Sequence, residues 1–248
     1  MRVISVTNQK GGCGKTTTSI NLSAYLAKNG KRTLLIDIDP QGAATTGLGV
    51  DKWGLDKTVY SVLIGEANMD DVVIPTKVPN LYLAPTNINL SGAVLELAGQ
   101  MGREYILKEK LNHVNGYDYI IIDTPPSLDL LTINALVAST EILVPVQTEY
   151  YALEGMSQLL KIVDMVDERL GTHLSRRFLL TMFDSRTKLS NEVADQVKGH
   201  FKGDVFQTVV PRNVKLAEAP SYGEPISMYD STSSGAKAYG ELAEEVMA

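Results

Sequence analysis

The sequence predicts an α/β fold, in which one doubly wound, mostly parallel sheet carries helices on both faces. Short apolar runs rich in β-branched residues recur along the chain, and segments of helical periodicity follow them. A glycine-rich loop joins the first apolar run to the first helical segment. The chain has 248 residues, 44% hydrophobic and 21% charged, which suits a single large domain over residues 1–248.

The elements are expected in the following order. Strands are predicted at residues 3–7, 33–37, 119–123, 141–146 and 178–182. The first helix is predicted over residues 16–29, before Gly30. A second follows Tyr151, where apolar residues recur every three or four positions: Leu153, Met156, Leu160, Val163, Val166 and Leu170. The C-terminal segment places Tyr239, Leu242, Ala243 and Val246 on one helical face, and residues 50–115 are expected to hold helices and surface loops.

Composition excludes several classes of protein. Cys13 is the single cysteine, so neither a disulfide nor a multi-thiolate metal or iron–sulfur site can form within one chain, as is typical of cytoplasmic proteins. The first apolar run stops at Val6, which disfavours a signal peptide, and no run approaches the ~20 residues of a membrane span. The net charge of -6 argues against a wholly basic surface but leaves room for a local basic patch.

The loop KGGCGKTT, residues 10–17, is typical of a phosphate site. Glycines let backbone amides converge on an anion, and the following helix directs its positive end at the same anion. Lys15 is expected to reach the β- and γ-phosphates, and the Thr16 hydroxyl to bind a phosphate-bound Mg²⁺. The alternative is a glycine-rich turn that merely begins a helix. The strand, loop, Lys-Thr pair and helix together disfavour it.

The additional lysine in this loop is informative about the family. The run Lys10, Gly11, Gly12, Cys13, Gly14, Lys15, Thr16 and Thr17 resembles the deviant Walker A motif of the ParA/MinD class of P-loop ATPases. The resemblance implies that these residues bind ATP, that Lys15 acts within its own subunit, and that Lys10 reaches the phosphates held by a second subunit. A cation supplied in this way makes dimerisation depend on the nucleotide.

Two further segments resemble the acidic motifs of that class. The resemblance of DIDPQG, residues 37–42, implies that Asp39 activates water and belongs to the metal site, and that Asp37 is structural or supports the site from behind. YIIIDTPPS, residues 119–127, resembles Walker B, so Asp123 is expected to hold Mg²⁺ through a water. Either aspartate alone could simply end a strand. Cys13 stands where the family usually has valine, and Ala43 where it has asparagine.

The resemblance extends over essentially the whole chain and is nearest to the short Soj-type ParA partition ATPases. VPRNVKLAEAPSYGEPI, residues 210–226, is similar to the segment that wraps adenine, with Pro211 and Asn213 at the base. The family implies an ATP-dependent sandwich dimer that binds DNA without sequence preference. It also implies a ParB-type centromere-binding partner that stimulates hydrolysis, and a cytoplasmic, nucleoid-associated location.

Charge patterning bears on the DNA interpretation. Residues 176–215 contain eight Lys and Arg against four Asp and Glu, which is equally compatible with an ordinary solvated surface. The family resemblance implies DNA contacts by Arg186 and Lys215, through salt-sensitive phosphate binding.

Proteins of this ATPase class also have other functions. A MinD-like protein binds membrane through a basic C-terminal helix, but the acidic residues here are Glu241, Glu244 and Glu245, which disfavours lipid. Positioning of a protein cargo stays open. A metabolic ATP-dependent enzyme of the dethiobiotin-synthetase type would need a substrate pocket that no motif announces.

The sequence predicts no functional role for a few other conspicuous residues. Trp53 is expected to pack locally, and His113, His173 and His200 to lie on the surface or in packing contacts. Glu149 and Glu154 lie in a well-matched segment but receive no role.

Overall fold

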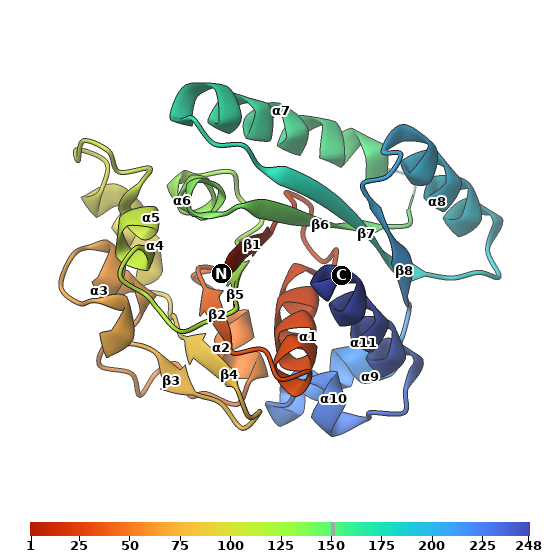
Figure 1. The fold of residues 1–248 in the computed structure, drawn as a ribbon, viewed down its shortest axis with the longest axis horizontal. Helices are drawn as coiled ribbons and strands as arrows, with labels where there is room; N and C mark the ends of the chain where they lie inside the picture. Colours follow the sequence, from red (N-terminus) through yellow and green to blue (C-terminus); the bar gives the residue numbers. More distant parts are fainter. Residues whose placement is uncertain (150–151) are drawn as a thin grey trace.

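The computed structural model describes residues 1–149 and 152–248, and the side chains at residues 152–155 are not described. Its centre is one sheet of eight strands in the order β3-β4-β2-β5-β1-β6-β7-β8 (Figure 1). The strands are β1 (Arg2–Val6), β2 (Thr33–Asp37), β3 (Ile74–Pro75), β4 (Leu81–Ala84), β5 (Tyr119–Asp123), β6 (Glu141–Gln147), β7 (Ser175–Phe183) and β8 (Val205–Pro211). All neighbours are parallel except the short edge strand β3, which is antiparallel to β4.

Helices cover both faces of this sheet, which confirms the predicted fold class. They are α1 (Lys15–Lys28), α2 (Ala43–Gly47), α3 (Val59–Leu63), α4 (Leu90–Glu96), α5 (Ile106–Leu111), α6 (Leu130–Ala138), α7 (Ala152–Leu170), α8 (Lys188–His200), α9 (Val214–Glu218), α10 (Ile226–Tyr229) and α11 (Ser234–Met247). One apolar cluster joins α1, α9, α10 and α11 to one face. Two further clusters pack α3 to α8 on the other face (Figure 1). The central strands β1, β2, β5 and β6 are therefore buried on both sides.

The strand order places the functional loops together. Because β1 lies between β5 and β6, the loops that leave the carboxyl ends of β1, β2, β5 and β6 open on one edge of the sheet. In register, Val6 lies beside Asp123 and Asp37 beside Asp123. The predicted phosphate loop and the two acidic motifs therefore meet at this edge.

Residues 50–115 differ from the expectation of helices and loops alone. They also contribute β3 and β4, and β4 pairs with β2 over four residues. Strand β8 likewise escaped the sequence analysis. β3 and β4 are short, and β8 includes the polar residues Gln207 and Thr208, so the local pattern of these strands is weak.

The C-terminal helix α11 packs on the body of the protein. Tyr239, Leu242, Ala243 and Val246 are buried in the same cluster as α1. The Glu245 carboxylate accepts hydrogen bonds from the backbone N–H groups of Gln207 (2.8 Å) and Thr208 (3.0 Å) on the edge strand β8. The helix thus covers part of a sheet edge that would otherwise present unpaired donors.

Candidate nucleotide site

The loop between β1 and α1 has the backbone of an anion cradle. Gly12 and Gly14 have φ of 70° and 95°, values that favour glycine, and α1 begins directly after Gly14. A Cβ added at Gly11 or Gly12 would meet no described atom within 4 Å, so the outer side of the loop is open. Gly14 offers no side chain to cap the helix, which leaves its first N–H groups free for an anion.

The two lysines of the loop have different partners. The Lys15 side chain is buried, and its Nζ donates to the backbone carbonyl of Lys10 at 3.2 Å. The Lys10 Nζ instead lies 3.4 Å from Oε2 of Glu149, beyond the end of β6. One ammonium is therefore folded over the loop, while the other faces a neighbouring loop.

Cys13 is held by its backbone and enclosed by its surroundings. Its carbonyl accepts a hydrogen bond from Oγ1 of Thr181 on β7 at 2.8 Å, which fastens the loop to the sheet. The thiol is fully buried, and this burial raises the pKa of Cys13. The thiol form is favoured and shielded, which opposes the thiol reactivity that an exposed cysteine would have.

Asp37 and Asp123 are adjacent, fully buried carboxylates in different environments. Asp37 Oδ2 accepts from the N–H and the hydroxyl of Thr45, both at 2.8 Å, and so ties α2 to the sheet. Asp123 Oδ1 accepts from the Ser19 hydroxyl at 2.8 Å, while Oδ2 is buried with no hydrogen-bond partner among the described residues. Burial raises the pKa of both groups, and the charge of Asp37 raises that of Asp123 further.

This arrangement fits a magnesium ion. Asp123 has an orphaned oxygen, and the Thr16 side chain lies close enough to this carboxylate to oppose part of the rise in its pKa. A divalent cation would offset the repulsion between the buried aspartates. No group of three or more His, Cys, Asp or Glu in residues 1–149 and 152–248 forms a metal site by itself. The pair Thr16 and Asp123 nevertheless suits Mg²⁺, because proteins bind this ion with few ligands of their own, together with water and substrate phosphates.

Asp39 lies at the mouth of the phosphate loop. It is 9% exposed, and its Oδ1 accepts from the Gln41 N–H at 2.9 Å. A cavity of about 260 Å³ is lined by Asp39 together with Gly11, Gly12, Gly14, Lys15, Thr16, Thr17, Pro126 and Met182. The structure therefore brings Asp39 to the predicted phosphate-binding residues, as a candidate water-activating group.

A second, more apolar cavity of about 330 Å³ adjoins the first. Gly14, Thr17 and Met182 line both cavities, and Pro211, Asn213 and Tyr239 line the second. The shared residues place the two spaces side by side, an arrangement that suits the base and the phosphates of one nucleotide. The side chain of Asn213 is already engaged, because Oδ1 accepts from the Lys215 N–H and Nδ2 donates to the Ser234 hydroxyl. These two bonds fix the orientation of the amide and leave one N–H donor and one lone pair of Oδ1 for a base.

Sequence reasoning missed three residues of this pocket. Thr181 holds the loop, Met182 adopts φ of 52°, which is unusual outside glycine, and the Tyr239 hydroxyl lies 3.0 Å from the Thr18 hydroxyl. Met182 and Thr181 end a predicted strand, and that position at the carboxyl edge was the available signal. Tyr239 belonged to a helical stripe that looked like ordinary core.

Arg186 lies on the loop that follows β7, and Lys215 lies in helix α9, which follows the parallel neighbour β8, so both are at the carboxyl edge of the sheet. Arg186 makes a bidentate pair with Asp184, with donor–acceptor distances of 2.9 and 2.7 Å, and its side chain is 87% exposed. Lys215 Nζ lies 2.9 Å from Glu218. Both candidate DNA contacts are therefore accessible cations that already have an acidic partner.

The remaining expectations concern Trp53, the three histidines, and residues of the helix that follows Tyr151. Trp53 meets its neighbour Lys52, whose Nζ lies 5.5 Å from the centre of the ring, and the residue is 71% exposed. The three histidines are exposed, as expected. Leu153 and Glu154 lie outside the residues whose side chains are described.

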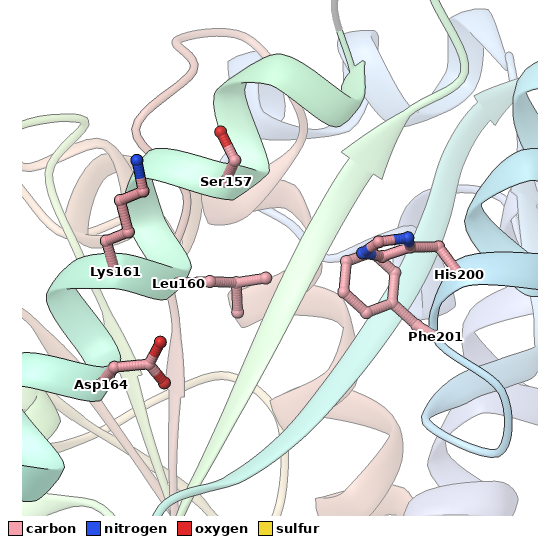
Figure 2. Close-up of a pocket in the computed structure, with 6 residues that line it drawn as sticks. All are labelled: Ser157, Leu160, Lys161, Asp164, His200 and Phe201. Atoms are coloured by element: carbon pink, nitrogen blue, oxygen red, sulfur yellow. The ribbon is translucent and has the colours of Figure 1, made fainter.

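A separate crevice of about 320 Å³ lies between α7 and the end of α8. Figure 2 shows its lining residues Ser157, Leu160, Lys161, Asp164, His200 and Phe201. None of them lines the phosphate or base cavity.

The described helices include none that is both long and apolar enough to cross a membrane.

Comparison with known proteins identifies a matching family model and similar sequences. A family model described as an AAA domain matches residues 1–176. The sporulation initiation inhibitor protein Soj of Bacillus subtilis is 54% identical over 249 residues, covering 100% of this chain and 98% of that protein. The chromosome-partitioning ATPase Soj of Treponema pallidum is 51% identical over 243 residues, covering 97% of this chain and 95% of that protein.

A solved structure shares the fold and carries a nucleotide. It is cobyrinic acid a,c-diamide synthase from Mycobacterium smegmatis with bound ADP and magnesium. The TM-score is 0.88 at 36% sequence identity, with 100% of this chain and 94% of that chain covered.

Proposed function

This chain belongs to the Soj and ParA family of chromosome-partitioning ATPases, and we propose that its ATP-bound form is a sandwich dimer that binds DNA without sequence preference. It is an ATPase that uses ATP and Mg²⁺. The observation that carries the proposal is the pair of adjoining cavities, which places the two-lysine loop and Asp39 beside an apolar pocket that suits a base.

Within one subunit, each residue of the site has a proposed task. The loop residues Gly11 to Thr17 cradle the phosphates, and Lys15 turns from the Lys10 carbonyl to the β- and γ-phosphates. Thr16 and Asp123 would hold Mg²⁺, which supplies charge neutralisation on the phosphates. Asp39 orients the attacking water beside this metal, and Pro211 and Asn213 border the base.

The dimer adds the second lysine. Lys10 is on the open side of the loop, with its side chain 32% exposed, and can reach a neighbouring molecule. We assign it to the phosphates of the partner subunit, where its charge favours the transition state and couples association to ATP. Hydrolysis removes the γ-phosphate and weakens this link, so that ADP-bound monomers leave DNA.

DNA binding is assigned to the edge that carries Arg186 and Lys215. Dimerisation places two such surfaces on one particle, which multiplies phosphate contacts and makes DNA affinity depend on ATP. A ParB-type centromere-binding protein is the proposed partner that stimulates hydrolysis. The cycle would position chromosomal or plasmid DNA in the cytoplasm, with the ATP form on the nucleoid.

Membrane binding is disfavoured by the packing of α11. A lipid-binding helix needs a free apolar face, but the apolar residues of α11 are in the core and its acidic Glu245 is bonded to β8. We also propose that residues 1–248 form one domain, because their apolar clusters lie on the faces of one sheet.

The proposal is tested by binding of the Asp39→Ala protein to random duplex DNA, with ATP or with ADP, across a salt series. We expect binding with ATP only, weakening as salt rises. Arg186→Ala should weaken it. Arg169→Ala, an exposed arginine at the end of α7 on the opposite edge of the sheet, should not. Absence of DNA binding at low salt by a protein that dimerises with ATP would overturn the DNA assignment.

A further inference from the structure

The carboxylate of Glu149 joins the phosphate loop to the base pocket. Its Oε2 lies 3.4 Å from Lys10 Nζ, and its Oε1 lies 3.5 Å from a guanidinium nitrogen of Arg212, which lines the base pocket. Gln147 Nε2 also donates to Oε1 at 2.6 Å. Three loops, which follow β1, β6 and β8, thus meet at one acidic side chain.

This contact is not what shapes the phosphate loop. The Lys10 backbone N–H donates to Asn8 Oδ1 at 3.0 Å, and Thr181 holds the Cys13 carbonyl, so the loop has its own supports. The side chains of Lys10 and Glu149 are 32% and 46% exposed, and ion pairs this accessible contribute little to folding. The pair therefore has little structural purpose.

The pair instead affects whether the Lys10 ammonium can extend to a second subunit. A lysine ammonium is a compact point charge, so the phosphates of another subunit would compete with the Glu149 carboxylate for Lys10. We propose that Glu149 is a positioning residue that holds Lys10 in its own subunit, so that ATP-dependent dimerisation must first break this pair. The inference rests on the proposed dimer and on the action of Lys10 across it.

The size of the effect follows from the number of pairs. Two Lys10–Glu149 pairs break for each dimer that forms, and each is an exposed pair of modest strength. Removal of the carboxylate should then raise the dimer association constant by about 2- to 30-fold. The substitution could also change the affinity of the monomer for nucleotide. Measurement at saturating nucleotide keeps every monomer loaded, so that the variants differ only in dimer association.

The test compares Glu149→Gln with the wild-type chain by sedimentation, with Mg²⁺ and a saturating ATP analogue that resists hydrolysis. Glu192→Gln is the matched control, because it also neutralises an exposed, lysine-paired carboxylate, on α8. Arg212→Gln removes the other cation of Glu149 and leaves the Lys10 pair. We expect the association constant to rise for Glu149→Gln alone.

A second measurement reads the pair directly. A zero-length carbodiimide reagent should join Lys10 to Glu149 within one wild-type chain, and the analogue should abolish this product in peptide mass spectra. Unchanged or weaker dimerisation of Glu149→Gln, an equal rise in Arg212→Gln, or a cross-link that persists in the dimer would each overturn the inference. A wild-type chain that forms the cross-link yet stays monomeric with the analogue would overturn the proposed dimer, and the inference with it.

Discussion

Replacement of Thr181 by valine should loosen the phosphate loop without changing the shape of the core. The Thr181 hydroxyl is the donor to the Cys13 carbonyl at 2.8 Å, and both residues are buried. Valine keeps the volume of threonine but leaves this carbonyl unsatisfied, which costs about 1–3 kcal/mol of folding free energy. For a chain of this size, the midpoint of thermal unfolding should fall by about 2–12 °C.

The same change should weaken ATP binding. A loop that has lost its support spends part of its time in arrangements that do not match the phosphates, and apparent affinity falls with the competent fraction. If that fraction drops to between one half and one tenth, the dissociation constant for the analogue rises about 2- to 10-fold. Calorimetric titration with the analogue and Mg²⁺ measures this, and urea unfolding measures the stability.

Thr181→Ser is the matched control, because serine retains the hydroxyl and loses only a methyl group. It should bind the analogue within about twofold of wild type. The reasoning is refuted if Thr181→Val binds and unfolds like wild type, or if Thr181→Ser weakens binding as much as valine does. In either case the hydrogen bond to Cys13 would not be what holds the loop.

Three further predictions concern charged residues. Lys15→Ala should abolish ATP binding, whereas Lys10→Ala should retain it and fail to dimerise; titration and sedimentation of both separate the two roles, and equal loss of ATP binding would contradict them. Asp184→Asn should release Arg186, and the plot of log affinity for DNA against log salt should steepen by about 0.9 for each Arg186 that gains a phosphate; an unchanged slope would show that the pair does not limit DNA contact. Glu245→Ala should destabilise the fold by about 2 kcal/mol in urea unfolding, because two N–H groups of β8 lose a charged acceptor that is partly exposed. A cost below about 0.5 kcal/mol would indicate that water replaces it.

Local sequence was enough to predict the centre of the fold and the phosphate loop. The central strands β2 and β5 have the expected bounds, and α1 begins within one residue of its prediction. Buried parallel strands are continuous apolar runs, and glycine is the residue that suits the positive φ of Gly12 and Gly14. Such features are determined by neighbours in the chain, so a pattern reveals them.

The tertiary structure decided which polar groups have partners. Asp37 and Asp123 both end apolar strands, yet their hydrogen bonding differs. Asp37 accepts two hydrogen bonds from Thr45, whereas one oxygen of Asp123 has no partner among the described residues. Lys10 meets Glu149 across 139 residues, and Thr181 meets Cys13 across 168. Strand order and register create these contacts, and no local pattern contains them. The physical reason is that composition and periodicity determine which segments form strands and helices, whereas the pairing of a buried charge depends on which distant segment the folded sheet places beside it.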